Sequence, residues 1–161
     1  MKSLALVCVF VVLALQGASA QATVFLVRHA EKAANGDAKN PDLSDIGQAR
    51  AKALGKSLKD TGVTAIYATE FKRTQQTAEP LAHAKGVEVT SIPANETATL
   101  VSKLKETKGN ALVIGHSNTL PEIIKALGVS DSIAIGDNDY DDLFVIINNV
   151  TPPKLLHLHY N

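Results

Sequence analysis

Residues 23–31 read TVFLVRHAE. The first five form a continuous apolar run of strand length, which is typical of a strand buried on both faces of a parallel sheet. Two basic residues, Arg28 and His29, follow directly. We therefore expect a buried strand over residues 23–27 whose carboxyl end carries polar chemistry.

Short apolar runs alternate with stretches of helical spacing along the rest of the chain. The pattern predicts further strands over 63–68, 87–92, 111–114, 143–148 and 155–160. It predicts helices from Ser44 to residue 58, over 71–85 with Gly86 as the C-cap, over 97–106, and from Pro121 to Gly128. This alternation indicates an α/β fold, a three-layer α/β/α sandwich around a mostly parallel sheet. We expect the first helix to bury the side that carries Ile46, Ala49, Ala53, Leu54 and Leu58.

Composition indicates one globular domain with no net charge and therefore no overall electrostatic field. The chain has 161 residues, of which 45% are hydrophobic and 20% charged, enough for a sizeable core. Sixteen Lys and Arg balance sixteen Asp and Glu. A polybasic nucleic-acid binder is therefore not expected, and an anion site has to be local. The sequence leaves the oligomeric state open.

Residues 1–20 have the pattern of a secretory signal peptide. Lys2 precedes an apolar run over 4–15, and Ala18-Ser19-Ala20 forms an A-x-A cleavage site. The run is about 12 residues long, against about 20 for a spanning helix, so no permanent membrane anchor is expected. We predict cleavage after Ala20, a single domain over 21–161, and a periplasmic or secreted protein. Cys8, the only cysteine, would be removed, which excludes disulfides and cysteine catalysis from the mature chain.

Basic side chains follow three of the expected strands, and the carboxyl ends of parallel strands form one edge where ligands bind. They are Arg28-His29, Arg73 within the segment after the second strand, and His116. The guanidinium fork matches a phosphate bidentately, and a neutral imidazole can attack phosphorus. This chemistry needs no metal and no cofactor, and we expect neither.

Three motifs carry a family resemblance: RHAE at 28–31, YATEFKRTQQTA at 67–78 and GHSNT at 115–119. Together they resemble the histidine phosphatase superfamily, also called phosphoglycerate-mutase-like, over residues 23–161. The resemblance implies that fold, with His29 as the phosphorylated nucleophile. It also implies that Arg28, Arg73 and the catalytic His116 form the phosphate pocket, with Asn35 as a further phosphate contact.

Two departures from the family pattern bear on the substrate. RHA stands where RHG is usual, which is similar to a small bacterial branch that includes protein-phosphohistidine phosphatases. Family members place an acidic proton donor after the third strand, and Glu96 is the candidate here. Glu31, Glu70, the cluster over 137–142, or no donor at all remain alternatives.

The resemblance and the export signal together favour a metal-independent phosphomonoesterase. We expect a phosphohistidine intermediate and a small phosphorylated substrate, either a phosphomonoester or a phosphorylated envelope sugar. One alternative is a non-catalytic module that binds phosphate or another anion on the same fold. Another is a protein-phosphohistidine phosphatase, which requires that the chain stay in the cytoplasm.

Two further groups invite a metal interpretation. Residues 137–142 begin like a calcium loop but lack its glycine and its final glutamate, so a solvated acidic loop at the pocket rim is expected. His157 and His159 share one face of the last expected strand. Their spacing could bind a metal, but a solvent-facing edge strand is the favoured interpretation.

Overall fold

The computed structural model describes residues 23–160, and the expected signal peptide lies outside them. The described residues form six strands and four helices. The strands are β1 (Thr23–Arg28), β2 (Val63–Ala68), β3 (Val89–Ser91), β4 (Asn110–Gly115), β5 (Asp142–Ile147) and β6 (Lys154–His159). The helices are α1 (Asp45–Leu58), α2 (Lys72–Lys85), α3 (Thr97–Glu106) and α4 (Leu120–Ala126).

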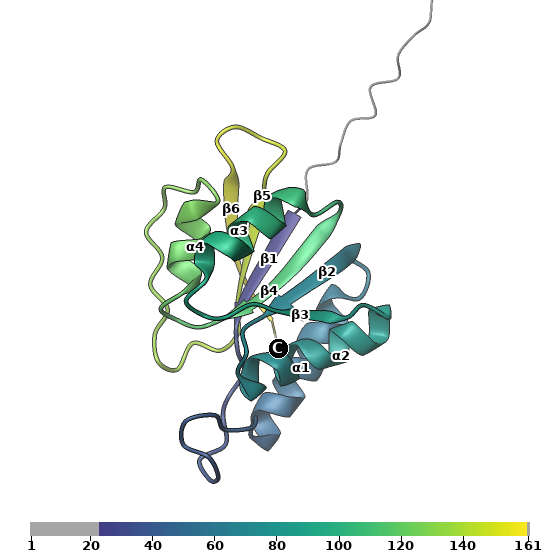
Figure 1. Ribbon diagram of the computed structural model, residues 1–161, viewed down its shortest axis with the longest axis vertical. Helices are drawn as coiled ribbons and strands as arrows, with labels where there is room; N and C mark the ends of the chain where they lie inside the picture. The colour runs from purple at the N-terminus through teal and green to yellow at the C-terminus, as the bar shows by residue number, and fades with distance from the viewer. Residues whose placement is uncertain (1–22, 161) are drawn as a thin grey trace, which may run out of the picture.

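All six strands belong to one sheet in the order β3-β2-β4-β1-β5-β6. The first four strands run parallel, β5 is antiparallel to β1, and β6 pairs antiparallel with β5 at one edge. Helices α1 and α2 cover one face, and α3 and α4 cover the other (Figure 1). The expected three-layer α/β/α sandwich with a mostly parallel sheet is confirmed.

Strand β1 lies inside the sheet and is buried on both faces, as its unbroken apolar run requires. Phe25 and Val27 pack into the core beneath α1 and α2. Val24 and Leu26, which point the opposite way, pack into the core beneath α3 and α4. Two separate cores therefore fix the direction of the strand that ends in Arg28 and His29.

The buried face of α1 differs from the expected one. Ile46 is 67% exposed, and the helix instead buries Gly47, Ala51, Leu54, Gly55 and Leu58. The reason is close approach, because a Cβ on Gly47 would lie 2.1 Å from the Glu31 carbonyl oxygen. Leu54 and Leu58 are buried as expected, whereas Gly47, Ala51 and Gly55 take the places expected for Ile46, Ala49 and Ala53.

The other helix boundaries follow their local signals closely. Ser44 caps α1 by accepting a hydrogen bond from the Gly47 amide, and Gly86 ends α2 in the left-handed conformation. Strand β3 is shorter than the expected 87–92. Within residues 23–160, none of the helices has the length and apolar character needed to cross a bilayer.

Candidate functional site

The carboxyl ends of β1 and β4 bring the two histidines of the predicted site together. The strands are parallel neighbours in which Arg28 pairs with Gly115, and the His29 amide donates to the Gly115 carbonyl at 3.0 Å. The His29 and His116 rings therefore lie edge to face, with centroids 5.2 Å apart. Both residues are buried.

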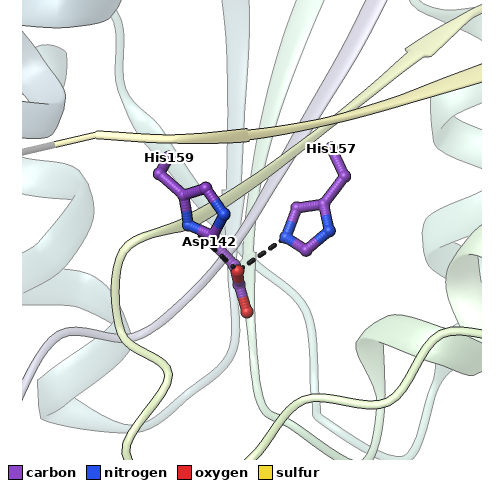
Figure 2. A group of neighbouring side chains, drawn as sticks. All are labelled: Asp142, His157 and His159. Carbon is purple, nitrogen blue, oxygen red and sulfur yellow. Dashed lines mark hydrogen bonds and ion pairs between the residues drawn. The ribbon is translucent and has the colours of Figure 1, made fainter.

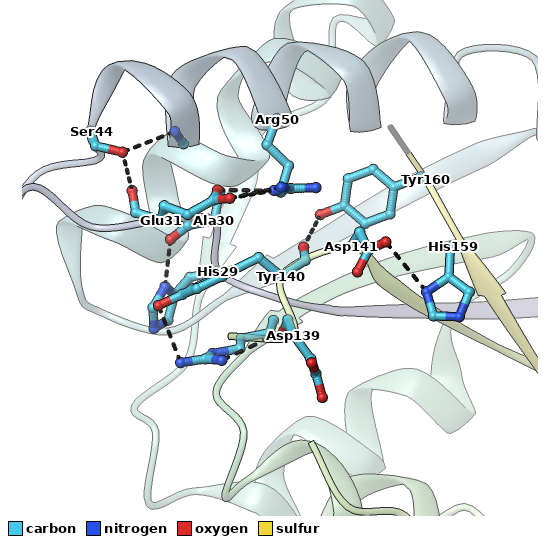
Figure 3. Close-up of polar contacts among 12 residues, drawn as sticks. His29, Ala30, Glu31, Ser44, Arg50, Asp139, Tyr140, Asp141, His159 and Tyr160 are labelled. Atoms are coloured by element: carbon cyan, nitrogen blue, oxygen red, sulfur yellow. Dashed lines mark hydrogen bonds and ion pairs between the residues drawn. The ribbon is translucent and has the colours of Figure 1, made fainter. Parts of the chain in front are cut away.

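The ring of His29 is held in one orientation and one tautomer. Its Nδ1 lies 2.8 Å from the Ala30 carbonyl oxygen (Figure 3). A carbonyl can only accept, so Nδ1 carries the proton and Nε2 keeps a free lone pair. Burial lowers the pKa of His29 to about 4; the bond to Ala30 opposes this, and the charges of His116, Arg73 and Arg28 add to it. The imidazole is therefore neutral at pH 7.

His116 is held by the hydroxyl of Thr69, in the segment between β2 and α2, which is in turn held by Thr74 in the first turn of α2. Its Nε2 lies 3.0 Å from Thr69 Oγ1, which in turn lies 2.9 Å from Thr74 Oγ1. Burial lowers the pKa of His116 to about 4, with further contributions from Arg73 and Arg28. The site thus holds two neutral imidazoles beside two guanidinium groups.

Arg73 comes to this edge from the first turn of α2. Its guanidinium carbon lies 4.4 Å from the centre of the Phe71 ring, and Phe71 packs edge-on against His116 at 5.3 Å. Thr77 ties the helix to the strand end, because its hydroxyl accepts from the Ala30 amide and donates to the Arg73 carbonyl. The positions of His29 and Arg73 are therefore coupled through one threonine.

Arg28 is held by the loop before β5. Its Nη1 donates to the carbonyls of Gly136 at 2.8 Å and Asp137 at 3.0 Å, and its guanidinium carbon lies 4.2 Å from the Tyr140 ring centre. Its buried Nε has no hydrogen-bond partner in the described part of the chain. The predicted solvated acidic loop is confirmed for Asp137 and Asp139, which are exposed, whereas its last residue, Asp142, is buried. The backbone carbonyls of the same loop turn inward and hold Arg28.

Glu31 serves the scaffold rather than the site chemistry. Arg50 binds it through two nitrogens: Nε lies 2.8 Å from Oε1 and 2.9 Å from Oε2, and Nη2 lies 2.7 Å from Oε1 (Figure 3). Burial raises the pKa of Glu31, but hydrogen bonding and the charge of Arg50 outweigh it, so the net pKa is lowered. A carboxylate kept ionised by an arginine is a poor proton donor.

The remaining predicted residues lie toward the periphery. Glu96 is exposed just before α3 and lines a hollow together with Thr69, Gly115 and Thr119. Glu70 accepts from the Ala94 amide at 2.9 Å, so it braces the loop that carries Glu96. Asn35 is exposed in the loop after β1, and no hydrogen bond joins it to the four basic residues within the region described.

The arrangement suits a dianionic ligand. Two guanidinium groups supply permanent positive charge, and a neutral imidazole with a directed lone pair supplies a nucleophile. Of the residues that build it, Thr69, Thr77 and Tyr140 were not predicted as site residues. Thr69 and Thr77 lie within the quoted 67–78 run, but nothing in the sequence alone separates a positioning hydroxyl from a helix cap.

Comparisons with known proteins agree with this geometry. Residues 24–96 match the model of the histidine phosphatase superfamily, branch 1. Phosphoserine phosphatase 1 of Hydrogenobacter thermophilus is 39% identical over 71 residues, which are 41% of this chain and 34% of that protein. The chain covers only about a third of the length of the curated relatives it matches.

Two solved structures share the fold at low identity. The protein histidine phosphatase SixA, in complex with tungstate, has a TM-score of 0.70 at 15% identity, covering 85% of this chain and 96% of its own. The alpha-ribazole phosphatase of Shigella flexneri has a TM-score of 0.69 at 16% identity, with 85% and 96% covered. These likenesses extend the fold match well beyond residue 96.

The lowered pKa values of His29 and His116 predict that the stability of the fold depends on pH. Between pH 6.5 and 4 the unfolded chain takes up protons that folded His29 and His116 do not, so the free energy of unfolding falls as the pH drops. The slope is up to about 1.4 kcal/mol per pH unit for each group. Urea unfolding between pH 7 and 4.5 should give a flatter profile for His29→Asn/His116→Asn than for wild type. His83→Asn, on the exposed surface of α2, should retain the wild-type slope; equal slopes in all three proteins would contradict the assignment.

Proposed function

Because the chain belongs to the histidine phosphatase superfamily, we propose that it hydrolyses phosphomonoesters through a phosphohistidine formed on His29. The observation that carries the proposal is the tautomer of His29. Its Nδ1 is occupied by the Ala30 carbonyl at 2.8 Å, which leaves Nε2 as a neutral nucleophile beside two fixed cations. We propose this activity for the domain that the structure describes, which matches only about a third of the length of the curated relatives.

The reaction has two steps. Nε2 of His29 attacks phosphorus, the bond from phosphorus to the leaving oxygen breaks, and that oxygen takes a proton. Water then attacks the phosphohistidine, the N–P bond breaks, and inorganic phosphate leaves with neutral His29 restored. Arg28, Arg73 and His116 hold the negative oxygens through both steps, and phosphoryl transfer gains most from such fixed charge.

The guanidinium groups supply the charge that a metal supplies elsewhere, so the proposed reaction is metal-independent. Both arginines are held in place: Arg73 by Phe71 and Arg28 by the loop over 136–140. SixA, with the same fold, was solved with the oxyanion tungstate. A small phosphorylated molecule is the ligand class that this set of two guanidinium groups and two imidazoles suits best.

Glu96 is the proposed acid for the leaving group. It lies on the rim of a hollow shared with Thr69, which contacts His116. The rival Glu31 is held by Arg50, and Glu70 by the Ala94 amide. A donor matters most when the leaving group is a poor one, such as an alkoxide.

We also propose export, on the strength of residues 1–20. Beyond the cytoplasmic membrane the accessible substrates are nutrient phosphomonoesters and phosphorylated envelope sugars. A protein-phosphohistidine phosphatase would need the chain to stay inside the cell. One further candidate is a module that binds an anion without turnover. The exposed position of Glu96 favours it, because no carboxylate contacts His29 or His116 within the described region.

The nucleophile predicts a covalent intermediate. Wild-type protein turning over para-nitrophenyl phosphate, with chelator present, should yield an acid-labile, base-stable phosphohistidine on rapid quenching. His29→Asn should lower turnover by at least about 10³-fold, because no other group replaces the nucleophile. His83→Asn is the matched control and should keep wild-type rates. Phosphate binding without turnover in the wild-type chain would instead identify the anion-binding module.

The proposed acid predicts a dependence on the leaving group. Glu96→Gln should slow hydrolysis of alkyl phosphates by about 10²- to 10⁴-fold while leaving para-nitrophenyl phosphate nearly unchanged, since nitrophenolate departs without a proton. Glu106→Gln, at the far end of the same helix, is the control. An equal loss on both substrates would remove Glu96 from the role of donor.

Export predicts a processed amino terminus. Expression of the full chain in a bacterial host followed by fractionation should place it outside the cytoplasm, with Gln21 as the first residue by N-terminal sequencing. A chain recovered in the cytoplasm with residues 1–20 intact would overturn export and favour the protein-phosphohistidine substrate.

A further inference from the structure

A second cluster of ligating side chains lies on the β5–β6 hairpin. His157 and His159 alternate along β6, and Asp142 is the first residue of β5. In the antiparallel register Asp142 pairs with His159, and Phe144 pairs with His157. Residues two apart and residues directly opposite share a face, so the two imidazoles and the carboxylate project together (Figure 2).

The ligand atoms are close enough for one ion. Asp142 Oδ1 lies 2.6 Å from His157 Nε2 and 3.5 Å from His159 Nδ1, and one ligand atom from each residue falls within 4.8 Å of the others. Zinc bonds to nitrogen and oxygen of about 2.0–2.2 Å in a tetrahedral site place ligand atoms roughly 3.4 Å apart. Small side-chain rotations reach that spacing from the observed one.

Within residues 23–160, the carboxylate of Asp142 has no lysine or arginine partner. Its side chain is only 7% exposed, and its ion-pair partners are His157 and His159, which, unlike lysine or arginine, are not obligatory cations. Asp141 adds a second carboxylate, with Oδ2 3.5 Å from His159 Nδ1 (Figure 3). A buried charge needs compensation, and a divalent cation here would compensate both carboxylates.

The geometry is also partly organised in advance. The His157 ring stacks on the fully buried Phe144, with centroids 4.6 Å apart and planes at 27°. The two histidine side chains are 46% and 59% exposed, so the cluster is open to solvent on one side. One carboxylate ligand and two histidines leave a fourth tetrahedral position for water or for Asp141.

We propose that Asp142, His157 and His159 bind one Zn²⁺, which fastens the edge strand β6 to β5. The imidazole and carboxylate donor set favours zinc over magnesium or calcium, which prefer oxygen ligands alone. The ligands are separate from the four basic residues of the phosphate pocket. The ion is therefore a structural clip, and the proposal stands whether or not the phosphatase assignment does.

Isothermal titration of the untagged, chelator-treated chain with ZnCl₂ tests this site. We expect one saturable equivalent in the wild type and, with Co²⁺, the intense visible bands of four-coordinate cobalt. Loss of a residue that only hydrogen-bonds to a metal ligand weakens metal binding by about 10- to 100-fold. Loss of a ligand itself should cost at least as much, so His157→Gln and His159→Gln should each weaken Zn²⁺ binding by at least about tenfold. Zn²⁺ at 100 times its Kd should raise the Tm of the wild type by roughly 5 °C or more.

Two control variants make the result decisive. His83→Gln removes an exposed histidine elsewhere and should bind Zn²⁺ as the wild type does. His29→Asn tests the other pair of imidazoles, His29 and His116, and it should also bind Zn²⁺ normally because neither residue belongs to the proposed site. Absence of saturable binding, or binding that survives both β6 variants, would overturn the proposal, as would binding lost in His29→Asn. The β6 histidines are exposed, so their replacement leaves the core intact.

Discussion

The pairing of β1 with β4 is the constraint on which the site depends. The two strands lie side by side within the sheet, and their register places Arg28 beside Gly115. His29 and His116 then leave the sheet at one edge, although 87 residues separate them in sequence. Gly115 lets the chain leave β4 toward His116 in close contact with α4, because a Cβ at position 115 would lie 2.9 Å from Leu120 Cδ2. A slip of this register would separate the two rings.

The electrostatics of the pocket follow from burial. Burial and positive neighbours both disfavour an imidazolium, so the two effects act in the same direction on His29 and His116. Arg28 is buried as well, and its charge is stabilised by carbonyl dipoles at 2.8 and 3.0 Å and by the Tyr140 ring. The result is a site in which two neutral imidazoles lie beside two guanidinium groups.

The sequence predicted the parts of this molecule that depend on local pattern. Apolar runs located the strands, and residues such as Ser44 and Gly86 located the helix ends, because capping depends on a few adjacent residues. The strand-end rule gathered the basic residues, since all parallel strands end at one edge.

Features set by long-range packing were not predictable. The buried face of α1 depends on how closely Gly47 approaches the Glu31 backbone and Gly55 approaches α2 at Pro80 and Leu81, which hydrophobicity does not encode. The stacking of Tyr140 on Arg28 depends on the conformation of a loop whose sequence predicts only that it is exposed to solvent. Asp142 was read as part of an acidic loop, because its burial depends on the register between β5 and β6.

Part of the site is built by residues after position 96, which the family model leaves unmatched, and the C-terminal hairpin belongs to this part. The match ends at residue 96, whereas His116 and the loop that holds Arg28 come later. Tyr160, just after β6, braces that loop: its amide donates to the Asp141 carbonyl at 3.0 Å and its hydroxyl to the Tyr140 carbonyl at 3.2 Å. The matched segment therefore supplies His29 and both arginines, and the part of the chain after residue 96 determines how Arg28 is held. Differences in substrate among proteins of this fold have room to arise in that second half, where loops can vary while the β1–β4 pairing stays fixed.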